Sequence, residues 1–269
     1  MMFATELRVE GLELRVESLE LKEMEGIYHK SYSKSLGRDM EYKTWGEKGH
    51  PILVFPSQDG RYYDYANFGM VDILMPWIES GKARVICCDG IDGETWSRQG
   101  QDNRWRIEQH ERWYNYIIEE LLPEVRLVPG ETFITTGCSM GAFHAANFFF
   151  RRPDVFDSVI ALSGLYTASY GFPGYSDDLT YMNSPVDFLR EMPLDHPWID
   201  LYKKDKIFIC VGQGRWEDEL LDSTRQLDGV LKGKGIPAFV DYWGYDVDHD
   251  WPWWRRQLPY FMEKVLGKS

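Results

Sequence analysis

The sequence predicts an α/β protein with a mainly parallel central sheet and helices on both faces. From about residue 27 onward, short apolar runs alternate with helix-like segments of ten or more residues, which is the pattern of strands joined by helices. The length of 269 residues is ordinary for one domain of this class. No linker rich in Gly, Pro or Ser divides the chain. We therefore predict one domain over residues 27–269.

Short runs rich in β-branched and aromatic residues, bounded by turn residues, are predicted to be strands. The runs at 28–33 and 40–45 are expected to form an antiparallel pair at one edge. The later runs alternate with helices, as parallel strands require, and lie at 52–55, 84–88, 132–136, 158–162, 206–211 and 237–243. Because such sheets bind ligands beyond the carboxyl ends of their strands, we expect the functional residues there.

Longer segments that permit helical periodicity are predicted to be helices at 69–80, 107–122, 140–150, 217–232 and 253–265. Residues 165–204 interrupt the alternation, because they are polar and aromatic and contain several Gly and Pro. We predict that this segment is a short loop-rich cap with one short helix near 186–191. Since it follows a strand, it is placed to cover the carboxyl edge of the sheet.

Residues 1–26 differ from the rest of the chain. The run at 6–12 is nearly repeated at 13–19, and the apolar positions Val9, Leu12, Val16 and Leu19 follow heptad spacing. Gly11 lies within this short repeat and argues against a stable coiled coil. We interpret the segment as an N-terminal appendage that is suited to pairing with a second copy, so that a homo-oligomer is one expected arrangement.

The composition excludes several classes of partner. The formal net charge of −13 argues against binding to nucleic acid or to an anionic membrane surface. No apolar stretch approaches the roughly 18 residues of a membrane span, and the N-terminus lacks the pattern of a signal peptide. The cysteines have no metal-ligand spacing and fall in or beside apolar runs, at Cys87, Cys88, Cys138 and Cys210. Such thiols are typical of a reducing compartment, so we expect a cytoplasmic protein.

The most informative motif is G-C-S-M-G at 137–141, which is centred on Ser139. It follows a predicted strand and precedes a predicted helix. This context is typical of a nucleophile elbow, where a serine on a tight strand-to-helix turn exposes its hydroxyl above the sheet. The flanking glycines allow helix and strand to approach without a Cβ clash. We predict that Ser139 is a nucleophile.

A serine hydroxyl needs a base to be reactive at neutral pH. Of the six histidines, His249 is the best candidate, because it lies between the last predicted strand and the last predicted helix. A loop at that place delivers a side chain over the sheet. His144 lies five residues after Ser139 on the elbow helix, so we expect it to point elsewhere.

The base in turn needs a carboxylate that orients it, and chain order places this acid between Ser139 and His249. Acidic residues follow the strand predicted at 206–211. A carboxylate in that loop is placed to accept the Nδ1–H of His249 and so to fix its tautomer. Asp218 and Glu217 are the candidates, and the residues alone do not decide between them.

The oxyanion hole is predicted to combine the backbone N–H of Met140 with one from the loop at 56–61. Pro56 has no N–H, so Ser57 or Gln58 must supply the second donor. No metal or cofactor is expected. The run from Asp246 to Asp250 begins like a calcium loop, but tryptophan replaces its required glycine. No phosphate loop, dinucleotide fingerprint or H-E-x-x-H motif occurs.

Taken together, these segments resemble the esterase family of α/β-hydrolases that includes esterase D, feruloyl and acetyl xylan esterases and the mycolyltransferase-like proteins. The resemblance extends from about residue 26 to the C-terminus, with matches at 54–60, 88–92, 96–97, 119–123, 137–141, 161–164, 249–251 and 254–255. It implies the α/β-hydrolase fold, a triad of Ser139, Asp218 and His249, and Met140 and Gln58 as oxyanion donors. Asp218 is favoured because the family's acid commonly lies seven residues before a helical arginine, here Arg225.

Two segments depart from the family's usual pattern. P-S-Q-D-G at 56–60 replaces H-G-x-x-G after the early strand, and G-Q-G-R-W-E-D at 212–218 replaces the G-T-x-D signature of the acid. Both lie where the predicted site takes its oxyanion donor and its carboxylate.

The combined prediction is a serine hydrolase that cleaves small-molecule or carbohydrate esters of carboxylic acids through an acyl-enzyme intermediate. Trp96 and Tyr166 are expected to line the substrate site. Two alternatives stay open. One is acyl transfer to an alcohol or sugar hydroxyl, and the other is a catalytically silent binding module of the same fold.

Overall fold

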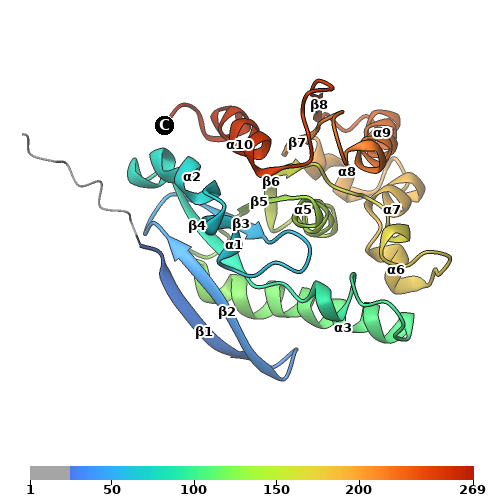
Figure 1. Cartoon of the computed structure of the whole chain (residues 1–269), viewed down its shortest axis with the longest axis horizontal. Coiled ribbons are helices and arrows are strands. Elements are labelled where there is room, and N and C mark those ends of the chain that lie inside the picture. The colour runs from blue at the N-terminus through green and yellow to red at the C-terminus, as the bar shows by residue number, and fades with distance from the viewer. Residues whose placement is uncertain (1–24) are drawn as a thin grey trace, which may run out of the picture.

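An eight-stranded sheet forms the centre of the protein, whose computed structural model describes residues 25–269 (Figure 1). Its strands are β1 (Ile27–Ser33), β2 (Arg38–Trp45), β3 (His50–Phe55), β4 (Ala83–Cys88), β5 (Phe133–Cys138), β6 (Phe156–Leu162), β7 (Lys206–Val211) and β8 (Phe239–Tyr242). They lie in the order β1-β2-β4-β3-β5-β6-β7-β8. β2 pairs antiparallel with β1 and β4, and the pairs from β4 to β8 are parallel. The predicted mainly parallel sheet with its antiparallel edge is confirmed.

Helices connect the parallel strands. They are α1 (Asp64–Asn67), α2 (Met70–Glu79), α3 (Asn103–Asn115), α4 (Leu122–Val125), α5 (Met140–Arg151), α6 (Asp178–Met182), α7 (Pro185–Glu191), α8 (Pro197–Tyr202), α9 (Asp218–Gly233) and α10 (Trp251–Leu266). Short 3-10 turns lie at η1 (Asp92–Glu94) and η3 (Ala168–Tyr170), and a π-helical segment, η2 (Tyr116–Leu121), continues α3. None of the helices in the described part of the chain is both long and apolar enough to cross a membrane.

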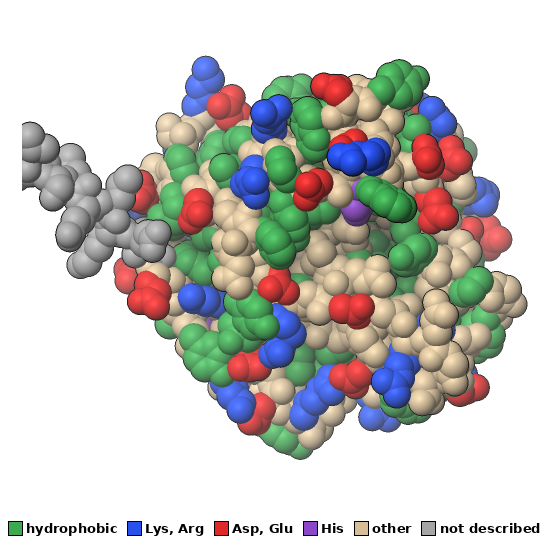
Figure 2. Space-filling view, in the orientation of Figure 1, with side chains coloured by type: hydrophobic (Ala, Val, Ile, Leu, Met, Phe, Trp, Pro, Cys, Tyr) green, Lys and Arg blue, Asp and Glu red, His purple; other side chains and the backbone are tan. Residues whose placement is uncertain are grey.

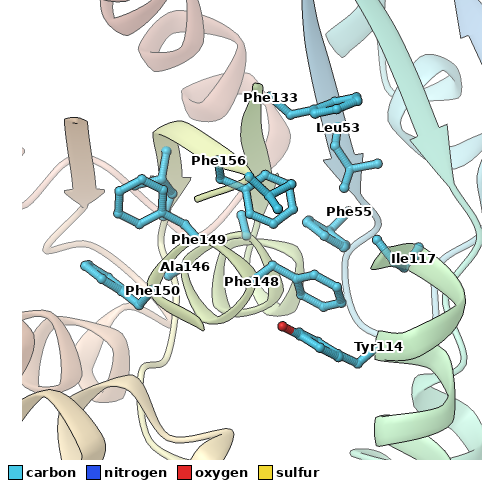
Figure 3. Close-up of a cluster of buried hydrophobic side chains, with 14 of the residues drawn as sticks. Leu53, Phe55, Tyr114, Ile117, Phe133, Ala146, Phe148, Phe149, Phe150 and Phe156 are labelled. Atoms are coloured by element: carbon cyan, nitrogen blue, oxygen red, sulfur yellow. The ribbon is translucent and has the colours of Figure 1, made fainter. Parts of the chain in front are cut away.

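Alternate residues of the central strands pack on opposite faces of the sheet, as the two-residue period of a strand requires. On β3, Leu53 and Phe55 belong to one buried core with side chains of α3, η2, α5 and α9. Ile52 and Val54 pack instead with α2 and α10. Figure 3 shows the first of these cores, where Phe148 of α5 lies against Phe55 with ring centroids 4.7 Å apart. The sheet is therefore covered on both faces, as predicted.

The predicted helix at 107–122 begins earlier than expected. α3 starts at Asn103, because the carboxylate of Asp102 accepts the backbone N–H of Trp105 and caps the helix. Polar residues occupy three of the first four helical positions, so the apolar period of the helix begins only at Ile107.

Residues 165–204 contain more helix than predicted. The short helix expected at 186–191 is α7, and α6 and α8 flank it. A capping box of Asp177 and Thr180 starts α6, and Pro197 occupies the first turn of α8. Helices of five to seven residues are too short to show a helical period in the sequence, so their capping residues are the only sequence signal for them. The predicted appendage at 1–26 lies, except for its last two residues, outside the described residues.

Candidate active site

Ser139 occupies the tight turn between β5 and α5 with φ 59° and ψ −123°. A non-glycine residue in this region costs about 1–3 kcal/mol and persists only where the surroundings enforce it. The neighbouring glycines explain how the turn closes. A Cβ on Gly137 would lie 2.4 Å from the backbone of Gly141, and a Cβ on Gly141 would lie 2.4 Å from the carbonyl oxygen of Phe55. The strand-turn-helix context predicted for the G-C-S-M-G motif is thus confirmed.

His249 lies in the loop between β8 and α10, and its Nε2 is 2.9 Å from the Oγ of Ser139. Two contacts orient the loop and the ring. The backbone N–H of His249 donates to the carbonyl of Arg215 at 3.0 Å, and the indole of Trp254 meets the imidazole edge to face with centroids 4.9 Å apart. The side chain of His249 is 18 % exposed. The hydroxyl and the imidazole predicted to meet above the sheet are therefore in hydrogen-bond contact.

The carboxylate next to His249 belongs to Glu217 and not to Asp218. The Oε2 of Glu217 lies 3.5 Å from the Nδ1 of His249, and Glu217 is fully buried. Asp218 is exposed and is the first residue of α9. Successive residues at a helix start point in different directions, so only one of the two neighbours reaches inward. The preference for Asp218 that the family spacing implied is corrected in favour of Glu217.

The two facing atoms have no other partner. Among residues 25–269, neither the Oε2 of Glu217 nor the Nδ1 of His249 forms a hydrogen bond, although both are buried. Their separation of 3.5 Å is an ion-pair distance but exceeds a hydrogen bond. Bonds of this kind are commonly long without substrate and shorten in the substrate complex. The pair therefore has the arrangement of an orienting acid and its imidazole.

Sequence reasoning missed two residues on the far side of this carboxylate. The Oγ of Ser163 donates to the Oε1 of Glu217 at 2.7 Å, and the Nε1–H of Trp254 donates to the same Oγ at 3.2 Å. Ser163 directly follows β6 and is fully buried. Its place after a strand at the carboxyl edge was the available signal.

The predicted oxyanion donors lie beside the elbow. Met140 is the first residue of α5, where a helix leaves its N–H groups unpaired. The Oγ of Ser57 donates to the carbonyl of Cys138 at 3.0 Å and ties the loop after β3 to the elbow. The amide of Gln58 is held elsewhere, donating to Ser97 at 3.0 Å. The contribution predicted for Gln58 is that of its backbone N–H.

Trp96 and Tyr166 lie in the packed interior and not along a substrate site. Trp96 is 4 % exposed, and its Nε1–H donates to the Nδ1 of His110 at 3.0 Å. Tyr166 is fully buried, and its backbone N–H donates to the Oγ of Ser223. Large aromatic side chains under a cap are commonly recruited to the core because they bury the most apolar area. The expectation that these two residues contact substrate is corrected.

Other aromatic side chains are exposed beside the site. Trp216 and Tyr245 are 82 % and 83 % exposed, and they lie in the two loops that carry Glu217 and His249. Trp216 also has φ 67°, a strained value for a bulky residue. In Figure 2, one histidine is visible at the edge of a shallow hollow, with hydrophobic and basic side chains beside it.

A polar cavity of about 470 Å³ lies between the loops that follow β3 and β4. Both loops begin at the carboxyl edge of the sheet. β3 is the neighbour of β5, and β4 is the next strand beyond β3. The lining includes Asp59, Asp92, Ser97 and Arg98. Ser97 also contacts Gln58, so the cavity adjoins the candidate oxyanion loop.

Other reactive groups near the elbow are inaccessible. His144 is 1 % exposed and its Nε2 is 2.9 Å from Asp92, so it points away from the hydroxyl as predicted. Burial lowers the pKa of His110 well below its usual range and keeps this imidazole neutral. Burial likewise raises the pKa of the Cys138 thiol next to Ser139, which leaves the sulfur unreactive.

The chain matches the family model described as "Putative esterase" over residues 33–264. It is also similar in structure to a ferulic acid esterase, with a TM-score of 0.70, 20 % identity, and 90 % of this chain and 97 % of the other covered. An S-formylglutathione hydrolase from Agrobacterium tumefaciens superposes with a TM-score of 0.71, 14 % identity, and 91 % and 96 % coverage.

The Staphylococcus aureus fluorophosphonate-binding serine hydrolase F has a TM-score of 0.66, 15 % identity, and 90 % and 98 % coverage. No curated protein matches the chain. The structural likenesses establish the α/β-hydrolase fold. The family match spans most of the sequence, so the chain belongs to this esterase family and is a carboxylic ester hydrolase.

Proposed function

We propose that this esterase cleaves its substrate through an acyl-enzyme, with Ser139 as nucleophile, His249 as general base and Glu217 as the orienting acid. The observation that carries the proposal is the 2.9 Å contact between the Oγ of Ser139 and the Nε2 of His249, made from a strained elbow. Glu217 supports it from the other side of the imidazole.

In the first half-reaction, the Oγ of Ser139 attacks the ester carbonyl carbon while the Nε2 of His249 takes its proton. The imidazolium that forms is stabilised by Glu217 through Nδ1–H. The carbonyl oxygen becomes an oxyanion, and the backbone N–H of Met140 with that of Ser57 or Gln58 accommodates its charge. The tetrahedral intermediate then expels the alcohol, which takes the proton from Nε2.

In the second half-reaction, His249 removes a proton from water, and the resulting hydroxide attacks the acyl carbon. The carboxylic acid leaves, and the proton returns to the Oγ of Ser139. Proton and charge are conserved over the cycle. An added alcohol that enters in place of water gives acyl transfer by the same steps, so the ratio of acid to new ester measures this alternative.

The proposed substrate is a small-molecule or carbohydrate ester. The polar cavity beside Gln58 offers carboxylate and hydroxyl groups that suit hydroxyl-bearing alcohols. The exposed rings of Trp216 and Tyr245 offer flat apolar faces on the loops that carry Glu217 and His249. The cavity adjoins the candidate oxyanion loop through the contact between Ser97 and Gln58, and the two rings lie in the loops that carry Glu217 and His249.

The test is turnover of p-nitrophenyl acetate and labelling by a fluorophosphonate probe. Wild type is expected to react with both, and Ser139→Ala with neither. The control is Ser169→Ala, which removes a serine hydroxyl from an exposed turn of the cap. Full turnover by Ser139→Ala would reject the nucleophile assignment. A wild type that neither turns over esters nor labels would favour the silent binding module.

A further inference from the structure

Ser163 has a backbone conformation that serine rarely adopts. Its φ is 55°, in the left-handed region, and its side chain is fully buried. Its backbone N–H donates to the carbonyl of Cys210 at 2.7 Å, which extends the pairing of β6 and β7 by one residue. The left-handed turn after that bond directs the side chain toward the loop that carries Glu217. Strain of this kind is retained where the surroundings hold the residue in place.

The hydroxyl of Ser163 lies within a directed series of hydrogen bonds. Trp254 has only a donor to offer, so its Nε1–H donates to the Oγ of Ser163 at 3.2 Å. The single hydroxyl proton of Ser163 is then donated to the Oε1 of Glu217 at 2.7 Å. This leaves Oε2 to face the Nδ1 of His249. Because the indole can only donate, it fixes the donor-to-acceptor direction of both hydrogen bonds in this series.

A glutamate needs such support more than an aspartate does. Its side chain has one additional rotatable bond, so its carboxylate has more orientations to choose from. Glu217 is fully buried, and within residues 25–269 the Oγ of Ser163 is the one hydrogen-bond donor to its carboxylate. A donor on Oε1 therefore sets the plane of the carboxylate and, with it, the position of Oε2.

Trp254 connects this support to the base itself. The same indole that donates to Ser163 packs edge to face on His249, with ring planes at 88°. Trp254 is 4 % exposed and lies in the first turn of α10. One rigid side chain thus touches both the imidazole and the hydroxyl that holds the acid.

We propose that Ser163 and Trp254 are positioning residues, which fix the carboxylate of Glu217 against the imidazole of His249. The inference rests on the proposed function, since it assigns their task within the same triad. Neither residue contacts the reacting atoms. Their contribution is to hold the acid in the orientation that the imidazolium requires.

The first test compares Ser163→Gly with Ser163→Ala. Glycine adopts a positive φ without strain, so Ser163→Gly removes the hydroxyl while easing the backbone. Both variants are expected to lower kcat about tenfold with little change in KM, because a lost hydrogen bond to a charged group has that magnitude. If Ser163 serves only the chain turn, Ser163→Gly keeps the wild-type kcat, and the proposal is overturned.

The second test is a double-mutant cycle with Glu217→Gln. A residue that acts through Glu217 has nothing left to position once that carboxylate is gone. Adding Ser163→Gly to Glu217→Gln is therefore expected to cause no further loss of kcat. Independent, multiplying losses would contradict the positioning role. Trp254→Phe keeps the aromatic ring and removes the N–H, so it should lower kcat in the same direction, and it replaces the serine variants should they fail to fold.

The third readout does not depend on turnover. In wild type, the Nδ1 proton of His249 is expected to give a low-field proton resonance that Glu217→Gln abolishes and Ser163→Gly shifts. A wild-type spectrum without this resonance, or one that Ser163→Gly leaves unchanged, would overturn the positioning role. A missing esterase activity with the resonance and its shift intact would instead overturn the proposed function, so the two failures are distinguishable.

Discussion

Glu217 and His249 face each other because the loops that carry them are joined backbone to backbone. The N–H of Gly214 donates to the carbonyl of Val247 at 2.9 Å, and the N–H of His249 donates to the carbonyl of Arg215 at 3.0 Å. The backbones approach so closely that a Cβ on Gly214 would lie 2.4 Å from an oxygen of Asp248. The candidate acid and the candidate base are thereby placed by these two backbone hydrogen bonds, here called the clasp, between the loops after β7 and β8.

Replacing each carboxylate in turn should show whether Glu217 or its neighbour Asp218 acts as the orienting acid. Glu217→Gln is expected to lower kcat by roughly a hundredfold or more, because an amide cannot stabilise the imidazolium. Asp218→Asn removes an exposed charge at the start of α9 and should leave kcat within about twofold, with a small loss of stability. Steady-state kinetics on a p-nitrophenyl ester decide. The reverse ranking of the two variants would restore Asp218 as the acid.

The clasp should depend on its glycines. A Cβ on Gly212 would lie 2.2 Å from the carbonyl oxygen of Val247, and backbone cannot move aside as a side chain does. Gly212→Ala is therefore expected to lower both the melting temperature and kcat. Gly229→Ala is the control, since nothing lies within 4 Å of the added carbon. In the interior of α9 it should stabilise the protein by up to about 1 kcal/mol.

Thermal unfolding measured with circular dichroism and activity on the same samples provide the comparison. Equal melting temperatures and kcat values for the two glycine variants would contradict the steric basis of the clasp.

At the opposite edge of the sheet, Asp205 should make stability depend on pH. Burial, with a smaller effect from Asp157, raises the pKa of Asp205 from 3.8 to about 7. The folded state therefore holds this proton more tightly than the unfolded chain, so stability should fall as pH rises from 3.8 to about 7. Asp205→Asn removes the effect.

The variant should be more stable than wild type at pH 8 by an amount of order 1 kcal/mol, because the partly exposed side chain is screened by water. At pH 4 the two proteins should unfold alike. Urea unfolding across this range measures the difference. A wild-type advantage that grows with pH would show that the carboxylate of Asp205 is stabilising.

The exposed aromatic rings beside the site should serve substrate binding and not folding. Trp216 and Tyr245 bury little of their surface in the protein, so Trp216→Ala and Tyr245→Ala should leave the melting temperature nearly unchanged. A lost aromatic contact with substrate is expected to raise KM several-fold for esters with large alcohol or acyl groups. Trp105→Ala, a partly exposed tryptophan on α3, is the matched control. Unchanged KM values across an ester panel would remove both rings from the binding site.

Local sequence patterns were sufficient to predict most of the strands and helices. β3 was recognisable from its continuous apolar run, β5 from its β-branched and aromatic residues, and α5 from the G-C-S-M-G motif at its start. The short helices α6 and α8 escaped because five or six residues do not reveal a period. Ser139 was predicted from the G-C-S-M-G motif between a strand and a helix, and His249 from its place in the loop before the last helix.

The acid and the lining residues could not be found in that way. Glu217 and Asp218 are adjacent, and both suit a helix start. Which carboxylate points inward depends on where α9 begins and on the hydroxyl of Ser163, which follows β6 and bonds Glu217. Trp96 and Tyr166 were expected to line the substrate site, yet both side chains are buried in the structure. Burial is a property of neighbours that are distant in sequence.

For this protein, the amino-acid sequence alone determined the layered α/β architecture and indicated Ser139 as the candidate nucleophile and His249 as its candidate base, because each signal lies in a short local segment of the chain. The tertiary structure decided which carboxylate meets the imidazole, what holds that carboxylate and which aromatic rings remain exposed. Those outcomes are set by contacts between loops at the ends of separate strands. There, a shift of one position along the chain decides whether a side chain points into the protein or toward solvent.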